Sequence, residues 1–231
     1  MARRMHSISW RNYRSKSQKI GSRKESFRGT RQLALLACEG STTEPQYFRD
    51  MFAWFIKRKA LSPHSFVIAK HGHTDPVGVL DDLLKYKGPF NETYRDFSLL
   101  WIVIDRDEER CNGGGHTLSN FNNALSSAAA KGIKVAWSNP CFEIWFLLHF
   151  QYRQTPVERD KLLEILPDII GCKYEKNTPG MFEHLLPYIS TAKKNAEKLS
   201  QLKRSPADAN PGTTVYELID DFEKIKPSNA S

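Results

Sequence analysis

Carboxylates at three places in this sequence have the types and spacing that could hold a divalent cation. They are Glu39 with Glu44, Asp105 with Asp107, and Glu143. Hard cations such as Mg²⁺ or Mn²⁺ prefer oxygen ligands, usually one or two carboxylates together with water and substrate phosphate. Two such ions about 4 Å apart can activate water and stabilise the leaving oxygen in phosphodiester cleavage. The chemistry that these residues favour is therefore metal-assisted hydrolysis.

A strand and a helix are the elements that would position Glu39. An apolar run over residues 33–38 ends at Glu39, Gly40 and three small hydroxyl residues follow, and Glu44-Pro45 opens an apolar-periodic stretch. This pattern predicts a buried strand, a tight turn and a helix over residues 44–59. Ligands of open α/β sheets bind at the carboxyl ends of the strands, where Glu39 would stand. The alternative is an ordinary polar residue after a strand, with Glu44 as a capping acid.

Asp105 and Asp107 directly follow a nearly all-apolar run over residues 97–104. Such a run is typical of a central strand that is covered on both faces. Residues i and i+2 of a strand lie on one side, so both aspartates can point at one cation. Neighbouring carboxylates raise each other's proton affinity unless a cation is bound, which favours a metal site. Turn formation at the strand end is the alternative.

Glu143 lies in a strongly apolar helix predicted over residues 141–150. A carboxylate there should be paired or coordinated, because an isolated buried charge is very costly. His149 lies about 240° around the helix from Glu143, so the two need not share a site. His149 could orient a substrate or be a core histidine. Ser138 and Asn139, just before the helix, could bind a phosphate or form the turn.

Strands and helices alternate through the first two thirds of the chain. Further strands are predicted at 65–70 and 133–137, and helices at 77–87 and 118–131. The alternation predicts an α/β fold with a mainly parallel sheet and helices on both faces. After Tyr152 the pattern predicts helices at 156–170, 180–186, 188–203 and 213–224, and no strand. We expect a core over residues 32–152 and a C-terminal helical segment over residues 153–226, packed on the core.

The basic residues gather at the N-terminus. The chain has 231 residues and a net charge of +8, yet residues 1–31 hold ten Lys or Arg and one acid, so the remainder is nearly neutral. This segment lacks periodicity, which predicts disorder. It would either contact nucleic-acid phosphates or be a solvated leader. The residues predicted to bind nucleic acid are Arg3, Arg4, Arg11, Arg14, Lys16, Lys19, Arg23 and Lys24.

The remaining composition indicates a soluble globular protein. No apolar run reaches the roughly 20 residues that cross a membrane, and no secretory signal is visible. The four cysteines form no CxxC pair, which fits a reducing, cytoplasmic compartment. His71 and His73 lack thiol partners at zinc-finger spacing.

Four stretches, in one order, carry a family resemblance: CEGSTTEPQYF, WIVIDRDE, SNPCFEIWFLLHF and NPGTTVYELI. The first two, a strand ending in Glu-Gly and a buried strand ending in Asp-x-Asp, resemble the Toprim fold of topoisomerases, primases and the nucleases of the overcoming-lysogenization-defect class. The whole set is similar to the RloB-like family of prokaryotic anti-phage and restriction-linked loci. The resemblance runs from about residue 33 to about residue 217.

The resemblance implies a Rossmann-like Toprim sheet and a metal-dependent nuclease of anti-phage defence, acting through abortive infection. The Toprim glutamate maps onto Glu39, its Asp-x-Asp onto Asp105 and Asp107, and the second glutamate of the nuclease motif onto Glu44. Glu143 belongs to the family's own third stretch. We expect Glu39, Asp105, Asp107 and Glu143 to be catalytic, and Glu39, Glu44, Asp105 and Asp107 to hold Mg²⁺ or Mn²⁺.

The resemblance leaves the substrate and the assembly open. DNA, RNA and in particular tRNA all fit as substrates, and a separately encoded ATPase is implied as a partner. A homo-oligomer is also compatible with the pattern. The alternative function is a non-catalytic subunit that binds nucleic acid or the ATPase within a defence complex.

Overall fold

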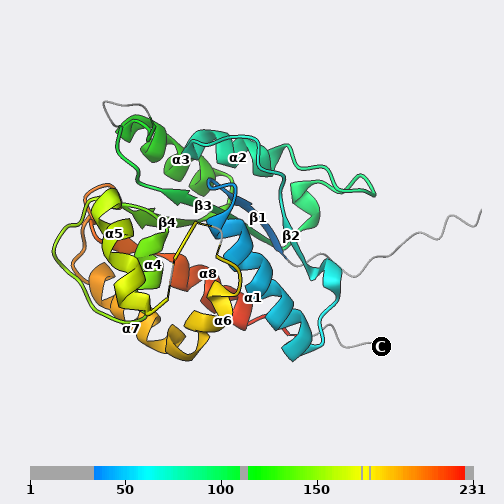
Figure 1. Ribbon diagram of the computed structural model, residues 1–231. Helices are drawn as coiled ribbons and strands as arrows, with labels where there is room; N and C mark the ends of the chain where they lie inside the picture. The colour runs from blue at the N-terminus through cyan, green and yellow to red at the C-terminus, as the bar shows by residue number, and fades with distance from the viewer. Residues whose placement is uncertain (1–33, 110–113, 173, 177, 227–231) are drawn as a thin grey trace, which may run out of the picture.

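The computed structural model describes residues 34–109, 114–172, 174–176 and 178–226 (Figure 1). The predictions for the basic N-terminal segment lie outside these residues. None of the helices in the described part of the chain has the length and hydropathy that a membrane crossing requires.

A five-stranded sheet forms the centre of the molecule, in the order β2-β1-β3-β4-β5. The first four strands are parallel, whereas β5 runs antiparallel to β4. The strands are β1 (Ala34–Cys38), β2 (Phe66–Ile68), β3 (Leu99–Asp105), β4 (Lys134–Asn139) and β5 (Gly212–Thr213). The predicted α/β fold with a mainly parallel sheet is therefore confirmed.

The prediction that no strand follows Tyr152 is wrong, because β5 pairs with the end of β4. A two-residue strand is too short to show an alternating pattern in the sequence. Side-chain hydrogen bonds help to hold β5 beside β4. The hydroxyls of Ser138 and Thr213 lie 3.0 Å apart, and the Trp137 backbone N–H donates to Thr214 Oγ1 at 3.0 Å.

The strand order places a topological switch point between β1 and β3. From β1 the chain goes to β2 on one side, and from β2 it returns to β3 on the other side. The carboxyl ends of β1 and β3 are adjacent, and the Glu39 backbone N–H donates to the Val103 carbonyl at 3.0 Å. Crevices at such points are the usual ligand sites of open α/β sheets.

Helices cover both faces of the sheet (Figure 1). Strand alternation turns Leu35 and Ile102 toward α2 and α3, whereas Leu36 and Val103 face the core that the other helices form. The first pair is α2 (Pro76–Leu84) and α3 (Leu118–Ala130); the opposite face has α1 (Thr43–Lys59), α4 (Glu143–Leu148), α5 (Arg159–Ile170), α6 (Met181–Leu185), α7 (Ile189–Ser200) and α8 (Val215–Glu223). Short 3₁₀ helices span Pro63–Ser65, Tyr94–Asp96 and Leu186–Tyr188.

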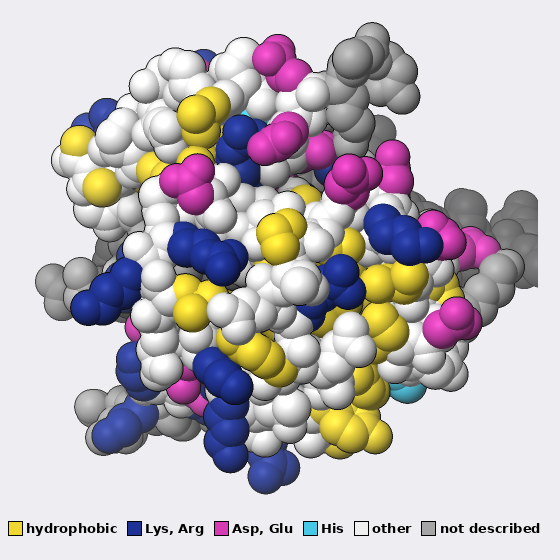
Figure 2. Space-filling model, turned by 90° about the vertical axis from the view of Figure 1, so that its left-hand side faces the viewer, with side chains coloured by type: hydrophobic (Ala, Val, Ile, Leu, Met, Phe, Trp, Pro, Cys, Tyr) yellow, Lys and Arg dark blue, Asp and Glu magenta, His cyan; other side chains and the backbone are white. Residues whose placement is uncertain are grey.

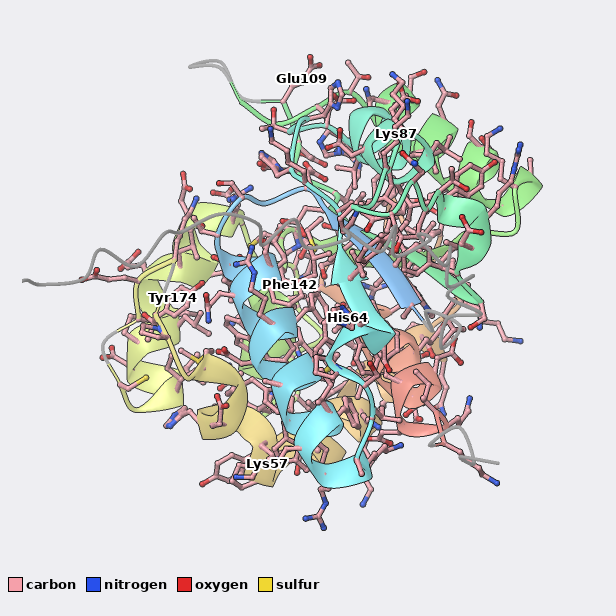
Figure 3. All side chains as sticks on the ribbon, turned by 90° about the vertical axis from the view of Figure 1, so that its right-hand side faces the viewer. Lys57, His64, Lys87, Glu109, Phe142 and Tyr174 are labelled. Atoms are coloured by element: carbon pink, nitrogen blue, oxygen red, sulfur yellow. The ribbon has the colours of Figure 1, made fainter. Side chains whose placement is uncertain are left out.

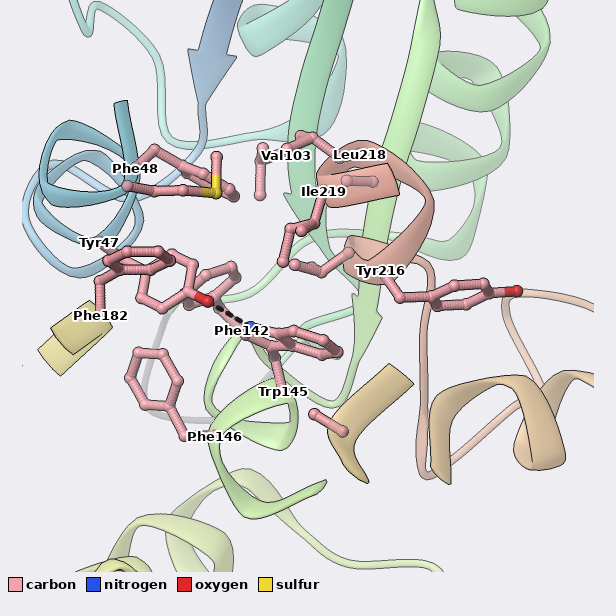
Figure 4. Close-up of a cluster of buried hydrophobic side chains, with 14 of the residues drawn as sticks. Tyr47, Phe48, Val103, Phe142, Trp145, Phe146, Phe182, Tyr216, Leu218 and Ile219 are labelled. Carbon is pink, nitrogen blue, oxygen red and sulfur yellow. Dashed lines mark hydrogen bonds between the residues drawn. The ribbon is translucent and has the colours of Figure 1, made fainter. Parts of the chain in front are cut away.

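Aromatic side chains join α1, α4 and α6 in the larger core (Figure 4). The Tyr47 ring lies 5.5–5.6 Å from the rings of Phe142, Phe146 and Phe182. The buried indole N–H of Trp145 donates to the Tyr47 hydroxyl at 2.9 Å. The C-terminal helices thus pack in the same core as α1, on one face of the sheet.

Candidate active site

A pocket of about 360 Å³ lies at the carboxyl ends of β1 and β3. Its lining includes all five carboxylates that the sequence singles out: Glu39, Glu44, Asp105, Asp107 and Glu143. The cationic residues Arg159 and Lys176 and the hydroxyl residues Ser41, Thr42 and Thr43 also line it. We call it the carboxylate pocket. Folding brings the predicted acids together, while the role of each one stays a prediction.

Glu39 links the two central strands. It follows β1, and its Oε2 accepts a hydrogen bond of 3.0 Å from the Asp105 backbone N–H. Its Oε1 lies 3.5 Å from Nδ1 of His116, a buried residue of the loop before α3. Both contacts hold the carboxylate at the rim of the sheet, where the switch-point crevice opens.

Glu44 lies in the first turn of α1 and folds back over the preceding turn. Its Oε1 accepts from the Gly40 backbone N–H at 3.2 Å, and a Cβ at position 40 would collide with this carboxylate. A larger residue at position 40 would therefore displace the Glu44 carboxylate from this position. Burial, followed by repulsion from Glu143 and Glu39, raises the pKa of Glu44 from 4.5 to about 7.

Asp105 and Asp107 have different surroundings although one residue separates them. Asp105 ends β3, and its buried Oδ1 has no hydrogen-bond partner in the part of the chain that the structure describes. Burial, then the charges of Glu44, Glu39 and Glu143, raise the pKa of Asp105 well above its ordinary value, against a smaller lowering by Arg159. Asp107 instead forms an ion pair with Arg159, the first residue of α5.

Glu143 is the first residue of α4 and is buried. Its Oε1 accepts a 2.9 Å hydrogen bond from the hydroxyl of Tyr174, on the segment after α5. In Figure 3, Tyr174 lies to the left of α1, and Phe142, which precedes Glu143, overlaps the helix in this view. The hydroxyl of Thr43, the first residue of α1, donates to the Lys176 carbonyl. The segment over residues 174–176 therefore closes one side of the pocket.

His149, Ser138 and Asn139, which the sequence analysis also considered, lie outside the lining of this pocket. His149 is buried in the core, with Nδ1 2.8 Å from the Trp145 carbonyl oxygen, and burial lowers its pKa to about 4. The Ser138 hydroxyl contacts Thr213. The Asn139 amide donates to the carbonyls of residues 206 and 207. The bonds of Ser138 and Asn139 hold the β4–β5 edge together.

The carboxylate pocket has the donor set of a Mg²⁺ or Mn²⁺ site, but its side chains are not arranged as a closed coordination shell. Over the described ranges, no three His, Cys, Asp or Glu side chains form a ready-made metal-binding group. The reason is that Glu39, Glu44, Asp107 and Glu143 each bind a protein group instead. Within the described residues Asp105 Oδ1 has no partner, and the pKa of Glu44 is raised, so added positive charge there would relieve repulsion. The residue types therefore fit Mg²⁺ or Mn²⁺, but the carboxylate side chains would have to rotate to coordinate the ion.

Sequence reasoning missed Arg159, Tyr174 and Lys176. They follow the last predicted strand by many residues and reach the pocket only because α5 and the segment after it pack beside α4. No motif or spacing in the sequence marks them. The same holds for His116, which lies near Glu39 only because the loop before α3 folds back on β3.

Comparison with known protein families finds a match. A model of the RloB-like protein family matches residues 34–222, a range that includes the five carboxylates of the pocket. No curated protein matches the chain, and no solved structure does either. The matched range runs from β1 to the last turn of α8.

Proposed function

Because this chain belongs to the RloB-like family, we propose that it is a metal-dependent nuclease of a bacterial anti-phage defence system. The observation that carries the proposal is the meeting of five carboxylates at the switch point of the sheet. Burial and neighbouring acids raise the pKa values of Glu44 and Asp105, which is an electrostatic cost to the fold that a divalent cation offsets. A metal-dependent nuclease uses such a cation beside the scissile phosphate.

Glu39, Asp105 and Asp107 would hold Mg²⁺ or Mn²⁺, with Glu44 and Glu143 beside them. The ion would stabilise charge on the phosphate and lower the pKa of water. Glu39, which accepts a hydrogen bond from the Asp105 backbone N–H, would act as the general base. Arg159 can exchange its contact with Asp107 for a contact with a substrate phosphate, which its planar guanidinium matches.

The test is cleavage by the purified full chain of tRNA, single-stranded RNA, and single-stranded and duplex DNA, with Mg²⁺, Mn²⁺ or EDTA. We expect products only with a divalent cation. Asp105→Asn should reduce the rate by roughly 100-fold or more, since a bound metal contributes several kcal/mol of transition-state stabilisation.

Asp168→Asn is the matched control, because Asp168 is an exposed acid of α5 outside the pocket lining. It should cleave like the wild type. Absence of cleavage with every substrate and metal, together with undiminished phage protection by Asp105→Asn cells, would instead favour the non-catalytic subunit. Binding of nucleic acid or of a separately encoded ATPase would then be the function.

The proposal includes a cytoplasmic location and a separately encoded ATPase as partner. It leaves open whether the substrate is tRNA, another RNA or DNA. Family membership supports the defence role. Co-purification from cells that carry the native locus would identify the ATPase. The substrate panel decides between RNA and DNA.

A further inference from the structure

A second pocket of about 270 Å³ adjoins the carboxylate pocket, and Asp107 and Arg159 line both. We call it the Arg106 pocket. Its volume lies just below the roughly 300 Å³ at which pockets for drug-sized ligands begin. It therefore suits a group about the size of one nucleobase. The Arg106 pocket would therefore lie beside a phosphodiester bond that is bound in the carboxylate pocket.

Arg106 lines this pocket, and two of its guanidinium donors have no acceptor in the described protein. The residue is 8% exposed, and its Nε and Nη1 are buried without a hydrogen-bond partner in the described ranges. Its Nη2 lies 3.6 Å from Glu108 Oε1, and the Glu108 side chain is 80% exposed. Buried charged donors without acceptors are unfavourable. A ligand with two adjacent acceptors would remove this cost.

The amide groups of the pocket wall are already used by the protein. Asn139 donates to the carbonyls of residues 206 and 207, and Asn210 both donates to and accepts from the backbone of Val157. These bonds fix the loops around the pocket. The Arg106 guanidinium and the surrounding carboxylates are left as the groups that would contact a ligand.

Besides Asp107, four acids line the Arg106 pocket: Glu108, Glu109, Glu158 and Asp160. On the face seen in Figure 2, acidic side chains gather in the upper half, and Figure 3 shows Glu109 on the outermost loop. Carboxylates repel a phosphate but accept hydrogen bonds from N–H groups. The pocket thus favours an uncharged ligand that has both adjacent acceptors and donors.

We propose that the Arg106 pocket reads a guanine base of the nucleic acid, next to the bond that the carboxylate pocket cleaves. This inference rests on the proposed nuclease function. Guanine offers O6 and N7 to the guanidinium, the commonest specific arginine contact, and its N1–H and amino group are donors for the carboxylates. Adenine has an amino donor in place of O6, and thymine or uracil presents a single carbonyl there. Arg106 is then a specificity-determining residue.

Binding of nucleosides tests this without phosphate, metal or turnover. Guanosine, 7-deazaguanosine, adenosine, cytidine and uridine are titrated into the full chain, with binding followed by NMR chemical shifts. We expect guanosine to bind about tenfold more tightly than each of the others, as one bidentate contact provides. Arg106→Gln should abolish this preference. Arg106→Lys should abolish it too, because lysine keeps the charge but lacks the planar pair of N–H donors.

Arg95→Gln is the matched control, because Arg95 is exposed and outside the pocket lining; it should keep the preference. If Arg106→Gln does not fold, the comparison of guanosine with 7-deazaguanosine on the wild type still decides. Equal binding of all nucleosides, or binding of inorganic phosphate but not guanosine, would overturn the proposal.

Failure of the pocket and failure of the nuclease give different results. Asp105→Asn should lose cleavage but keep the guanosine preference. Cut sites on oligonucleotides of varied sequence should be enriched in an adjoining guanine, and Arg106→Gln should relax that enrichment. Cleavage without base preference would contradict the Arg106 pocket alone. A guanosine preference without cleavage would contradict the nuclease alone.

Discussion

Glu44 and Asp105 are side chains whose ionised forms the fold disfavours. Both are buried among other acids, and the pKa of each is raised. A carboxyl with a raised folded pKa stabilises the fold below its unfolded pKa, and this stabilisation is lost as pH rises through the folded pKa. At neutral pH, therefore, both residues lower the free energy of unfolding. The same negative charges make the pocket attractive to cations.

The pH dependence of unfolding tests this for Glu44. In EDTA, the free energy of unfolding of Glu44→Gln should exceed that of the wild type by a margin that grows from pH 4.5 to pH 7. The margin should approach about 3 kcal/mol, because each pKa unit corresponds to about 1.4 kcal/mol. Urea titrations at each pH measure it.

The control for this series is Glu164→Gln, an exposed acid of α5. The free energy of unfolding of Glu164→Gln should differ little from that of the wild type, and the difference should not depend on pH. A margin for Glu44→Gln that shrinks toward neutral pH would mean that the protein stabilises the charged form. Addition of Mg²⁺ should reduce the Glu44→Gln margin, since the cation stabilises ionised Glu44 and its neighbours.

Sequence reasoning identified the acids of the pocket but not the groups that bind them. Glu39 and Asp105 end apolar strands, so their place at the rim follows from the pattern of the chain. Arg159 and Tyr174 contact Asp107 and Glu143 only through packing of the C-terminal segment. That packing depends on side-chain shape across the core, which a one-dimensional pattern does not contain.

At the scale of elements, α1 and α4 must stay in register because each contributes one acid to the pocket. The buried hydrogen bond from Trp145 to Tyr47 joins them, in addition to their ring contacts. Glu44 lies one helical turn before Tyr47, and Glu143 lies two residues before Trp145. This bond therefore helps to set the separation of two pocket carboxylates.

Tyr47→Phe should lower the free energy of unfolding by about 1–3 kcal/mol, because the indole N–H of Trp145 would be left buried without an acceptor. Chemical denaturation measures the loss. Tyr188→Phe is the control, since Tyr188 is 45% exposed; it should change stability by less than about 0.5 kcal/mol. Equal stability of wild type and Tyr47→Phe would show that the bond contributes nothing.

The predicted elements agree with the structure where the pattern is long and differ where it is short. The apolar run over residues 97–104 became β3, extended at its end to include Asp105. The helix predicted over residues 141–150 is only Glu143–Leu148, and the flanking Cys141, Phe142 and Phe150 lie outside it although they are as apolar as the helix itself. Hydropathy alone cannot separate a helix end from a buried turn.

At the scale of the whole molecule, the last helix is packed against the first elements of the chain. Phe222 of α8 lies 5.3 Å from the ring of Phe52 in α1 and 5.6 Å from that of Phe66 in β2. Lys59, at the end of α1, donates to the carbonyls of residues 222, 223 and 225. Residues 34–226 should therefore unfold together rather than as separate core and C-terminal units.

Phe222→Ala should cost about 3–5 kcal/mol, the usual range for removing a fully buried phenyl ring. Thermal unfolding should remain a single transition at a lower temperature, with circular dichroism and tryptophan fluorescence changing together. Phe90→Ala, at a residue that is 76% exposed, should have little effect. Two separate transitions in Phe222→Ala would show that the C-terminal helices are an independent unit.

The two outer strands of the sheet have a consequence for behaviour at high concentration. In the described ranges β2 has three residues and β5 has two, so each border of the sheet offers little unpaired backbone. Long, flat borders are templates on which a second molecule can add a strand and start a fibril, and very short ones are a natural protection against this. The native fold should accordingly resist amyloid-type growth, which would begin only after the sheet itself has come apart.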